Sequence, residues 1–209
     1  MQEARTARRN ILEITAALIK ELREKTGVGM MVCKEALNET KGDFTLAVEY
    51  LRKKGIATAQ KRSSRTTSEG QIQAYIHGGG KIGVLIEVNC ETDFSGKSED
   101  FTNFVKDVAM HIAATSPIAI GRDDVSAVIL EKEKEIYAEQ ARESGKPEKI
   151  IDKIVEGKVA KFYEENCLLE QAFVKNPDNT IQDLLNDLIA KTGENIIIKR
   201  FVRFQLGDA

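Results

Sequence analysis

The sequence predicts an α+β protein: a three-helix module, a linker, and a core in which helices pack on a three-stranded antiparallel sheet and a helical hairpin protrudes. Apolar residues recur at helical spacing between Ile14 and Gly55. Residues 71–77 and 82–88 instead alternate apolar with polar or mixed side chains, which is typical of half-buried strands. Residues 123–165 are dense in charge, with sparse apolar residues at helical spacing.

Composition agrees with a globular protein of one large or two smaller domains. The chain has 209 residues, of which 42% are hydrophobic, and its formal net charge is −2. We find no apolar run that could cross a bilayer and no signal peptide, so we expect a cytoplasmic protein without a membrane partner. The near-neutral charge argues against direct nucleic-acid binding, because phosphate binding normally requires a basic excess.

The cysteines and histidines form no recognisable site. Cys33, Cys90 and Cys167 are odd in number and far apart, which predicts reduced, mostly buried thiols. His77 and His111 match no metal-ligand pattern, so we expect neither a metal nor a cofactor. No nucleophile is paired with a base, and the sequence does not predict an enzyme.

The first region contains an extension at residues 1–13, which we expect to be disordered, and a three-helix module at residues 14–55. Asp43 is a candidate N-cap of the third helix, and Gly55 is the candidate end of that helix. Compact modules of this size usually bind other proteins. A linker at residues 56–69 follows; its basic residues suit a solvated tether, with contact to RNA as the alternative.

Two methionines follow the glycine turn between the first and second helices of this module. Met30 and Met31 have flexible, polarizable side chains, which often form adaptable contact surfaces. They are equally suited to filling the module's own core. The sequence leaves both interpretations open.

The first part of the core spans residues 70–122. Its two strands are joined through Gly78–Gly80 as a β-hairpin; this is not a phosphate loop, because no helix follows it. A clean apolar stripe then predicts a helix that ends at Ser116–Pro117. His111 falls at the edge of the stripe, which predicts an ordinary half-buried histidine.

The second part of the core spans residues 166–209. Asn176–Asn179 reads as a turn, Ile181–Leu188 as a short helix, and Ile196–Leu206 as the last strand, although Arg200 interrupts one face of that strand. A third strand would complete a small antiparallel sheet covered by helices on one side.

A helical hairpin at residues 123–165 separates the two parts of the core. Gly145–Pro147 interrupts it, and proline suits the first turn of the returning helix. Two helices joined by a short turn lie antiparallel. The charges favour a solvated surface, while the thin apolar seam leaves contact with a partner open.

The most informative residues are Thr92, Asp93 and Phe94, which follow the second strand. One interpretation is that Phe94 folds onto its own core while Asp93 caps the next helix. The other is that the ring is a probe that enters a partner protein, because an aromatic ring in water gains nothing unless it packs.

Several strings together resemble the elongation factor Ts family, the guanine-nucleotide exchange factors of bacterial and organellar translation. The strings are Leu22–Lys34, Glu87–Phe94, Ala109–Ala114, Ser144–Pro147 and Gln171–Val174. The resemblance implies a ubiquitin-associated-like module at residues 14–55 and a coiled-coil hairpin at residues 123–165. It also implies the short form of the family, with a single core subdomain supplemented by homodimerisation. Some short members carry a cysteine in the last strand where this chain has Val202, so a non-covalent dimer is implied.

The partner implied by this resemblance is elongation factor Tu, both GDP-bound and nucleotide-free. Phe94 would be the wedge and Asp93 its polar guide near the magnesium site of the GTPase. The other implied contact residues are Lys20, Arg23, Met30, Met31, Thr92, His111, Phe173 and Val174. An adaptor that binds proteins through the three-helix module is the alternative function.

Overall fold

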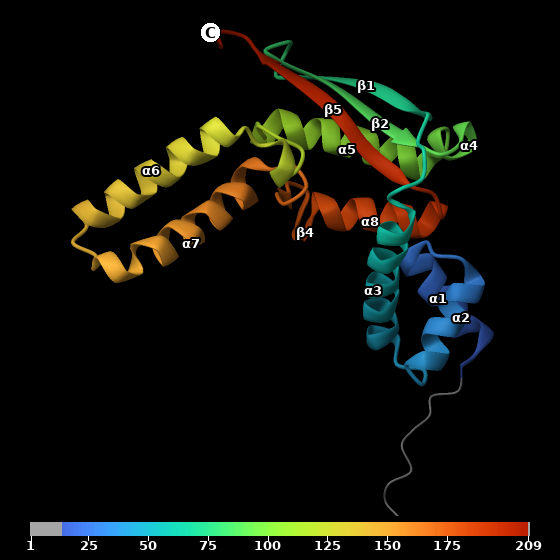
Figure 1. Ribbon diagram of the computed structural model, residues 1–209. Coiled ribbons are helices and arrows are strands. Elements are labelled where there is room, and N and C mark those ends of the chain that lie inside the picture. Colours follow the sequence, from blue (N-terminus) through green and yellow to red (C-terminus); the bar gives the residue numbers. More distant parts are fainter. Residues whose placement is uncertain (1–13, 209) are drawn as a thin grey trace, which may run out of the picture. The chain divides into compact units, whose positions relative to one another are not determined.

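The computed structural model describes residues 14–208 (Figure 1). The extension predicted at residues 1–13 lies outside the described residues. The chain divides into two compact units. One unit contains the residues up to Arg65 together with Asn186–Asn195, and the other contains Thr66–Leu185 and the residues from Ile196 onward.

The first unit contains the three predicted helices: α1 (Ala16–Thr26), α2 (Met30–Glu39) and α3 (Phe44–Arg62). Asp43 is the N-cap of α3, as predicted, and its carboxylate accepts a hydrogen bond from the Leu46 backbone N–H at 2.9 Å. Small and aliphatic side chains make up the core of these helices. The buried members are Leu22, Val28, Cys33, Ala36, Leu37, Ala47 and Leu51.

The predicted end of the third helix is wrong. Gly55 lies inside α3 and is buried, and the helix continues to Arg62, so the beginning of the predicted linker is helical. A Cβ atom at Gly55 would lie 3.2 Å from Ala190 Cβ of α8 (Ile181–Thr192). The glycine therefore provides space for a neighbouring side chain and does not terminate the helix.

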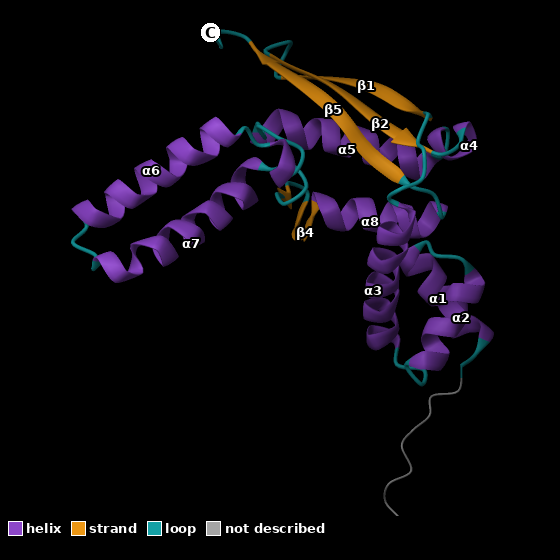
Figure 2. Cartoon of the chain, in the orientation of Figure 1, coloured by secondary structure: helices purple, strands orange, loops and turns teal. Residues whose placement is uncertain are grey.

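The second unit is built on a three-stranded antiparallel sheet in the order β1–β2–β5 (Figure 2). Its strands are β1 (Glu69–His77), β2 (Ile82–Cys90) and β5 (Ile196–Gln205), which confirms the predicted antiparallel sheet. Helix α5 (Glu99–Thr115) lies against one face of the sheet in Figure 1. Alternate strand residues and one stripe of α5 form the core between them. Buried there are Val84, Ile86, Val88, Cys90, Phe101, Phe104, Val105, Val108, Ile112, Ile196 and Ile198.

A β-bulge in β5 changes which side chains face outward. Val88 pairs with Ile198 and Glu87 with Arg200, so Lys199 is an extra residue between the two pairs. Before the bulge the even-numbered residues face α5, and after it they face outward. Arg200 therefore lies on the outer face without interrupting the core.

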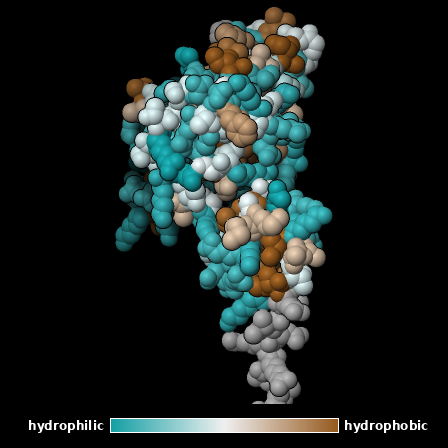
Figure 3. Space-filling model, turned by 90° about the vertical axis from the view of Figure 1, so that its right-hand side faces the viewer, coloured by the Kyte–Doolittle hydropathy of each residue, from teal (hydrophilic) through white to brown (hydrophobic). Residues whose placement is uncertain are grey.

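The outer face of the sheet exposes apolar side chains. They come from all three strands: Ile72, Ile76, Leu85, Val202 and Phe204. In Figure 3, hydrophobic groups gather at the top of the view, at the height of the β1–β2 turn in Figure 1. The apolar alternation predicted for β1 is thus present, but it points away from α5.

The predicted helical hairpin consists of α6 (Ala127–Glu143) and α7 (Glu148–Asn166), which lie side by side in Figure 1. A short 3₁₀-helix, Arg122–Asp124, precedes α6. Within residues 14–208, no helix is both long and apolar enough to span a membrane.

The turn predicted at Asn176–Asn179 is wrong. These residues belong to β4 (Asn176–Thr180), which pairs with β3 (Ala172–Phe173), and the turn lies at Val174 and Lys175. The proline in this string is tolerated because the two-stranded ladder is short and irregular, so few backbone N–H groups are required.

Candidate functional site

Phe94 lies on a single helical turn, α4 (Asp93–Gly96), directly after β2. Its side chain is 83% exposed, so the ring does not fold back onto its own core. Asp93 is also not the cap that one interpretation assumed. Thr92 is the N-cap of α4, and its Oγ1 accepts a hydrogen bond from the Ser95 backbone N–H at 3.3 Å.

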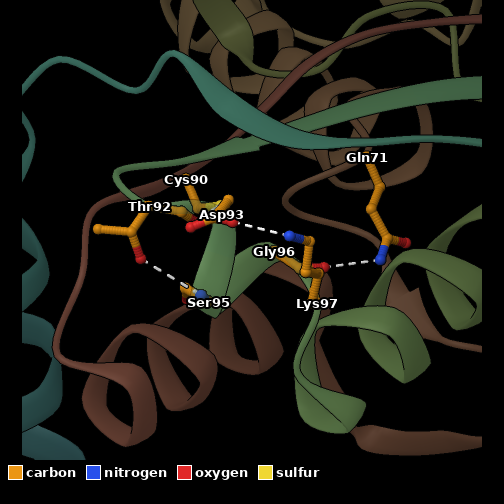
Figure 4. Close-up of polar contacts among 7 residues, drawn as sticks. All are labelled: Gln71, Cys90, Thr92, Asp93, Ser95, Gly96 and Lys97. Atoms are coloured by element: carbon orange, nitrogen blue, oxygen red, sulfur yellow. Dashed lines mark hydrogen bonds and ion pairs between the residues drawn. The ribbon is translucent and has the colours of Figure 1, made fainter.

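The backbone of α4 is held from both sides (Figure 4). Before the turn, the Cys90 thiol donates a hydrogen bond to the Thr92 carbonyl oxygen at 3.1 Å. After it, Gln71 Nε2 donates to the Gly96 carbonyl oxygen at 2.6 Å. Gly96 is packed so closely that a Cβ atom there would lie 3.3 Å from Cys90 Sγ. The exposed ring thus stands on a firmly anchored backbone.

The carboxylate next to this ring is already paired. Asp93 Oδ2 lies 2.7 Å from Lys97 Nζ, and both side chains are exposed. The hydrogen bond and charge of Lys97 lower the pKa of Asp93, and those of Asp93 raise the pKa of Lys97. Both groups are therefore charged at neutral pH.

A second group of predicted residues lies near the C-terminal end of α5. His111 is fully buried, so the half-buried prediction is wrong; the segment that begins at Gln171 covers it. His111 Nε2 lies 2.9 Å from Gln171 Oε1, and Nδ1 accepts a hydrogen bond from the Val174 backbone N–H at 3.4 Å. These partners assign a neutral ring with its proton on Nε2. Burial lowers the pKa of His111, an effect that the hydrogen bond to Gln171 partly opposes.

Of the three predicted residues in this group, only Val174 presents much surface. Phe173 is buried, and its ring centroid lies 6.0 Å from that of His111. Val174 is 42% exposed, at the turn between β3 and β4. Glu99, the first residue of α5, and His111 are twelve positions apart, which corresponds to about 18 Å along the helix. The His111 group therefore lies toward the end of α5 that is farther along the chain from α4.

The third group lies in the first unit, on both sides of the turn between α1 and α2. Lys20 and Arg23 are exposed on α1, and Lys20 Nζ lies 3.6 Å from Glu24 Oε1. Met30 and Met31 begin α2 and are 51% and 75% exposed, so they do not fill the module's core. Of the two interpretations of these methionines, a contact surface or core filling, the structure supports the surface position.

Comparison with known proteins decides the family. A family model described as Elongation factor TS matches residues 49–208. The chain belongs to the elongation factor Ts family. Curated members are similar along nearly their whole length. An elongation factor Ts from Syntrophobacter fumaroxidans is 62% identical over 197 residues, covering 94% of this chain and 98% of that protein. One from Desulfotalea psychrophila is 61% identical over 196 residues, covering 94% and 100%.

A third relative has a similar level of identity. The elongation factor Ts of Moorella thermoacetica is 58% identical over 195 residues, covering 93% of this chain and 96% of that protein. Membership of the elongation factor Ts family makes this chain a translation elongation factor of the nucleotide-exchange type.

Two residues beside α4 were not identified from the sequence. Lys97 carried a usable signal, because it lies four positions after Asp93, the spacing of an ion pair on a helix. Gln71 carried none: it lies on β1, and only the pairing of β1 with β2 brings it to α4. Among residues 14–208, no group of three or more His, Cys, Asp or Glu side chains could hold a metal ion.

Proposed function

We propose that this chain is the guanine-nucleotide exchange factor for elongation factor Tu and acts in the cytoplasm. In this proposal it binds the GDP-bound GTPase and inserts Asp93 and Phe94 near the magnesium site. The nucleotide-free GTPase remains bound until a new nucleotide enters. No covalent chemistry is involved, and excess GTP sets the direction of exchange.

The observation that carries this proposal is the exposed ring on an anchored turn. Phe94 is 83% exposed although apolar side chains are normally buried, and both ends of its short helix are fixed by hydrogen bonds. Burying the ring in a partner would contribute about 2–3 kcal/mol. An adaptor that used only the three-helix module would leave this ring without a role.

A wedge is sufficient because of the geometry that magnesium requires. Mg²⁺ demands near-octahedral oxygen coordination, so a small displacement of its protein ligands weakens the metal and, with it, the bound GDP. The free energy gained by burying Phe94 is comparable to a typical allosteric coupling of about 1–3 kcal/mol. By linkage, rebinding of nucleotide must in turn weaken the binding of the factor.

The remaining site residues would hold the two proteins together. Lys20, Arg23, Met30 and Met31 would grip the GTPase domain; all four are exposed. Val174 would contact the GTPase near its phosphate-binding side. His111 and Phe173 are buried in the free chain, so we assign them the task of supporting the Val174 turn.

Release of fluorescent GDP from elongation factor Tu tests this proposal. We expect Phe94→Ala to slow the maximal release rate about tenfold or more, because about 1.4 kcal/mol of lost coupling corresponds to a factor of ten. Val128→Ala is the matched control, because Val128 is also a highly exposed apolar residue, on α6. Release at the wild-type rate with Phe94→Ala would show that the ring is not the wedge.

We further propose that a second copy of the chain covers the outer face of the sheet. The exposed apolar residues of this face come from all three strands. Leu85 on β2 is paired with Val202 on β5 within this apolar surface. On the same face, Arg200 Nε lies 2.7 Å from Glu87 Oε2. Each copy would therefore present one negative and one positive side chain to the other copy. A self-complementary patch of this kind suits a two-fold dimer.

Light scattering after size exclusion tests the dimer. We expect a dimer for the wild type and a monomer for Leu85→Glu, which places a charge in the apolar patch. Val202→Cys should give a disulfide-linked dimer after mild oxidation, whereas Val128→Cys should not. The three native cysteines are buried, so they do not interfere. A wild-type monomer at all accessible concentrations, or a dimer unaffected by Leu85→Glu, contradicts this interface.

A further inference from the structure

We propose that Gln71 is a positioning residue for nucleotide exchange: it fixes α4 so that Phe94 is held outward before any partner arrives. This inference rests on the proposed function, in which Phe94 acts as the wedge. Gln71 lies outside the Thr92–Phe94 motif, on the neighbouring strand β1, and acts on the ring only through the backbone of α4.

The amide of Gln71 joins three elements. Its Nε2 donates one hydrogen bond to the Gly96 carbonyl oxygen at 2.6 Å and another to Thr102 Oγ1 on α5 at 3.0 Å. A side-chain amide nitrogen has two N–H donors, so both are used. The contact to Gly96 is drawn in Figure 4. Gln71 thereby ties the last residue of α4 to the sheet and to the first turn of α5.

The backbone around this contact leaves little room for alternatives. A Cβ atom at Gly96 would lie 3.4 Å from Gly70 Cα, so the end of α4 lies directly on β1. Phe94 is only two residues before this anchored position. The direction of its side chain therefore follows from where Gly96 is held.

The anchor matters because α4 is too short to be stable by itself. A four-residue helix has barely one turn, and the first turn of a helix is unfavourable without tertiary contacts. If the Gln71 amide is lost, the turn will sample other conformations, in which the ring is no longer held outward. The rate of insertion then falls with the fraction of chains in the right conformation.

Gln71→Met tests the inference, because methionine keeps the length of the side chain and lacks the donor. Gln73→Met is the matched control, because Gln73 lies on the same strand two residues away. Within residues 14–208, the Gln73 amide donates only to the carbonyl oxygen of its neighbour Ala74. We expect Gln71→Met to lower the maximal rate of GDP release from elongation factor Tu about three- to tenfold, the size of one net hydrogen bond. The half-saturating concentration should change little, since it reflects docking through other residues.

Gln71→Glu tests whether the loss of the N–H donor, and not a change in side-chain volume, slows exchange. Glutamate has the same shape, but at neutral pH its carboxylate would face the Gly96 carbonyl oxygen without a proton to donate. We expect it to be at least as slow as Gln71→Met. A wild-type rate for Gln71→Glu overturns the inference, and this variant also provides the answer should Gln71→Met fail to fold.

The double variant with Phe94→Ala distinguishes positioning from general damage. If Gln71 acts through the ring, Gln71→Met causes no further slowing once Phe94 is alanine. An additive loss means a structural role and overturns the inference. The proposed function fails separately, if Phe94→Ala alone exchanges at the wild-type rate. If Phe94→Ala is slow but Gln71→Met equals Gln73→Met, only the inference about Gln71 fails.

Discussion

Lys97 Nζ lies 2.7 Å from Asp93 Oδ2, so the carboxylate beside the exposed ring is paired with its own chain before any partner is present. Both side chains are exposed, and the pair contributes little to stability. Its main effect is electrostatic. It lowers the pKa of Asp93 and fixes the direction of its carboxylate.

The first prediction is that Lys97→Met raises the pKa of Asp93 toward its ordinary value, because the hydrogen bond to Lys97 is the largest cause of the lowered pKa. A carbon-detected NMR titration of the Asp93 carboxyl measures this. A carboxyl group with a lowered pKa stabilises the fold above its ordinary pKa and loses that contribution as the pH falls through the lowered value. Lys106→Met on α5 is the control. Unchanged titration of Asp93 in Lys97→Met would contradict the pairing.

The second prediction concerns Gly70, beside the anchor of α4. Its φ of 141° is rarely adopted by other residues, and a Cβ atom there would lie only 2.1 Å from the Val88 carbonyl oxygen. We expect Gly70→Ala to lower the free energy of unfolding by about 2 kcal/mol or more, measured by denaturant titration. Gly79→Ala, where φ is 67° and no neighbour lies within 4 Å, should cost only about 1 kcal/mol. Equal losses in the two variants would show that the close approach at Gly70 is unimportant.

The third prediction is that His111 makes the fold sensitive to acid. Burial lowers its pKa, so between the ordinary value of about 6.5 and the lowered folded value the unfolded chain binds a proton that the folded chain does not. Stability contributed by the neutral ring is therefore lost as the pH falls through this window. Protonation would also place an N–H on Nδ1 against the Val174 N–H.

Thermal unfolding midpoints measured between pH 7.5 and 5 test this prediction. We expect His111→Gln to lose less stability than the wild type over this range, although it is less stable at neutral pH. His77→Gln, at an exposed histidine on β1, should keep the wild-type slope. The same slope in all three proteins would rule out His111 as the source.

The fourth prediction is a stabilising change. Gly157 is an exposed residue inside α7, and a Cβ atom there would meet no neighbour within 4 Å. Gly157→Ala should raise the free energy of unfolding by about 0.5–1 kcal/mol, because alanine restricts the unfolded chain and favours the helix. Gly55→Ala in α3 should gain less or lose stability, since its Cβ atom would press on Ala190. A larger gain at Gly55 than at Gly157 would contradict this reasoning.

Much of the architecture followed from local patterns in the sequence. The alternation in residues 71–77 and 82–88 predicted β1 and β2, the stripe ending at Ser116 predicted α5, and Asp43 was identified as a cap from residue type alone. These signals are local: each depends on residues within a few positions of one another. The exposure of Phe94 was one of two interpretations, and only the structure decided between them.

The features that were missed depend on contacts between distant residues. Gly55 looks like a helix end unless Ala190 is known to need the space. The depth of His111 depends on Gln171, sixty positions later in the chain, which covers it. The outward position of Arg200 depends on the bulge at Lys199, which alternation alone does not reveal. Gln71 could not be connected to α4 before the strand register was known.

The bulge at Lys199 has a consequence for solubility. In the three-stranded sheet β5 is an edge strand, and a flat, apolar edge strand invites foreign strands to add to it and start aggregation. An extra residue twists the edge locally, and Lys199 and Arg200 place exposed positive charges along it. The border of the sheet therefore resists growth into fibrils, although the outer face beside it exposes apolar side chains.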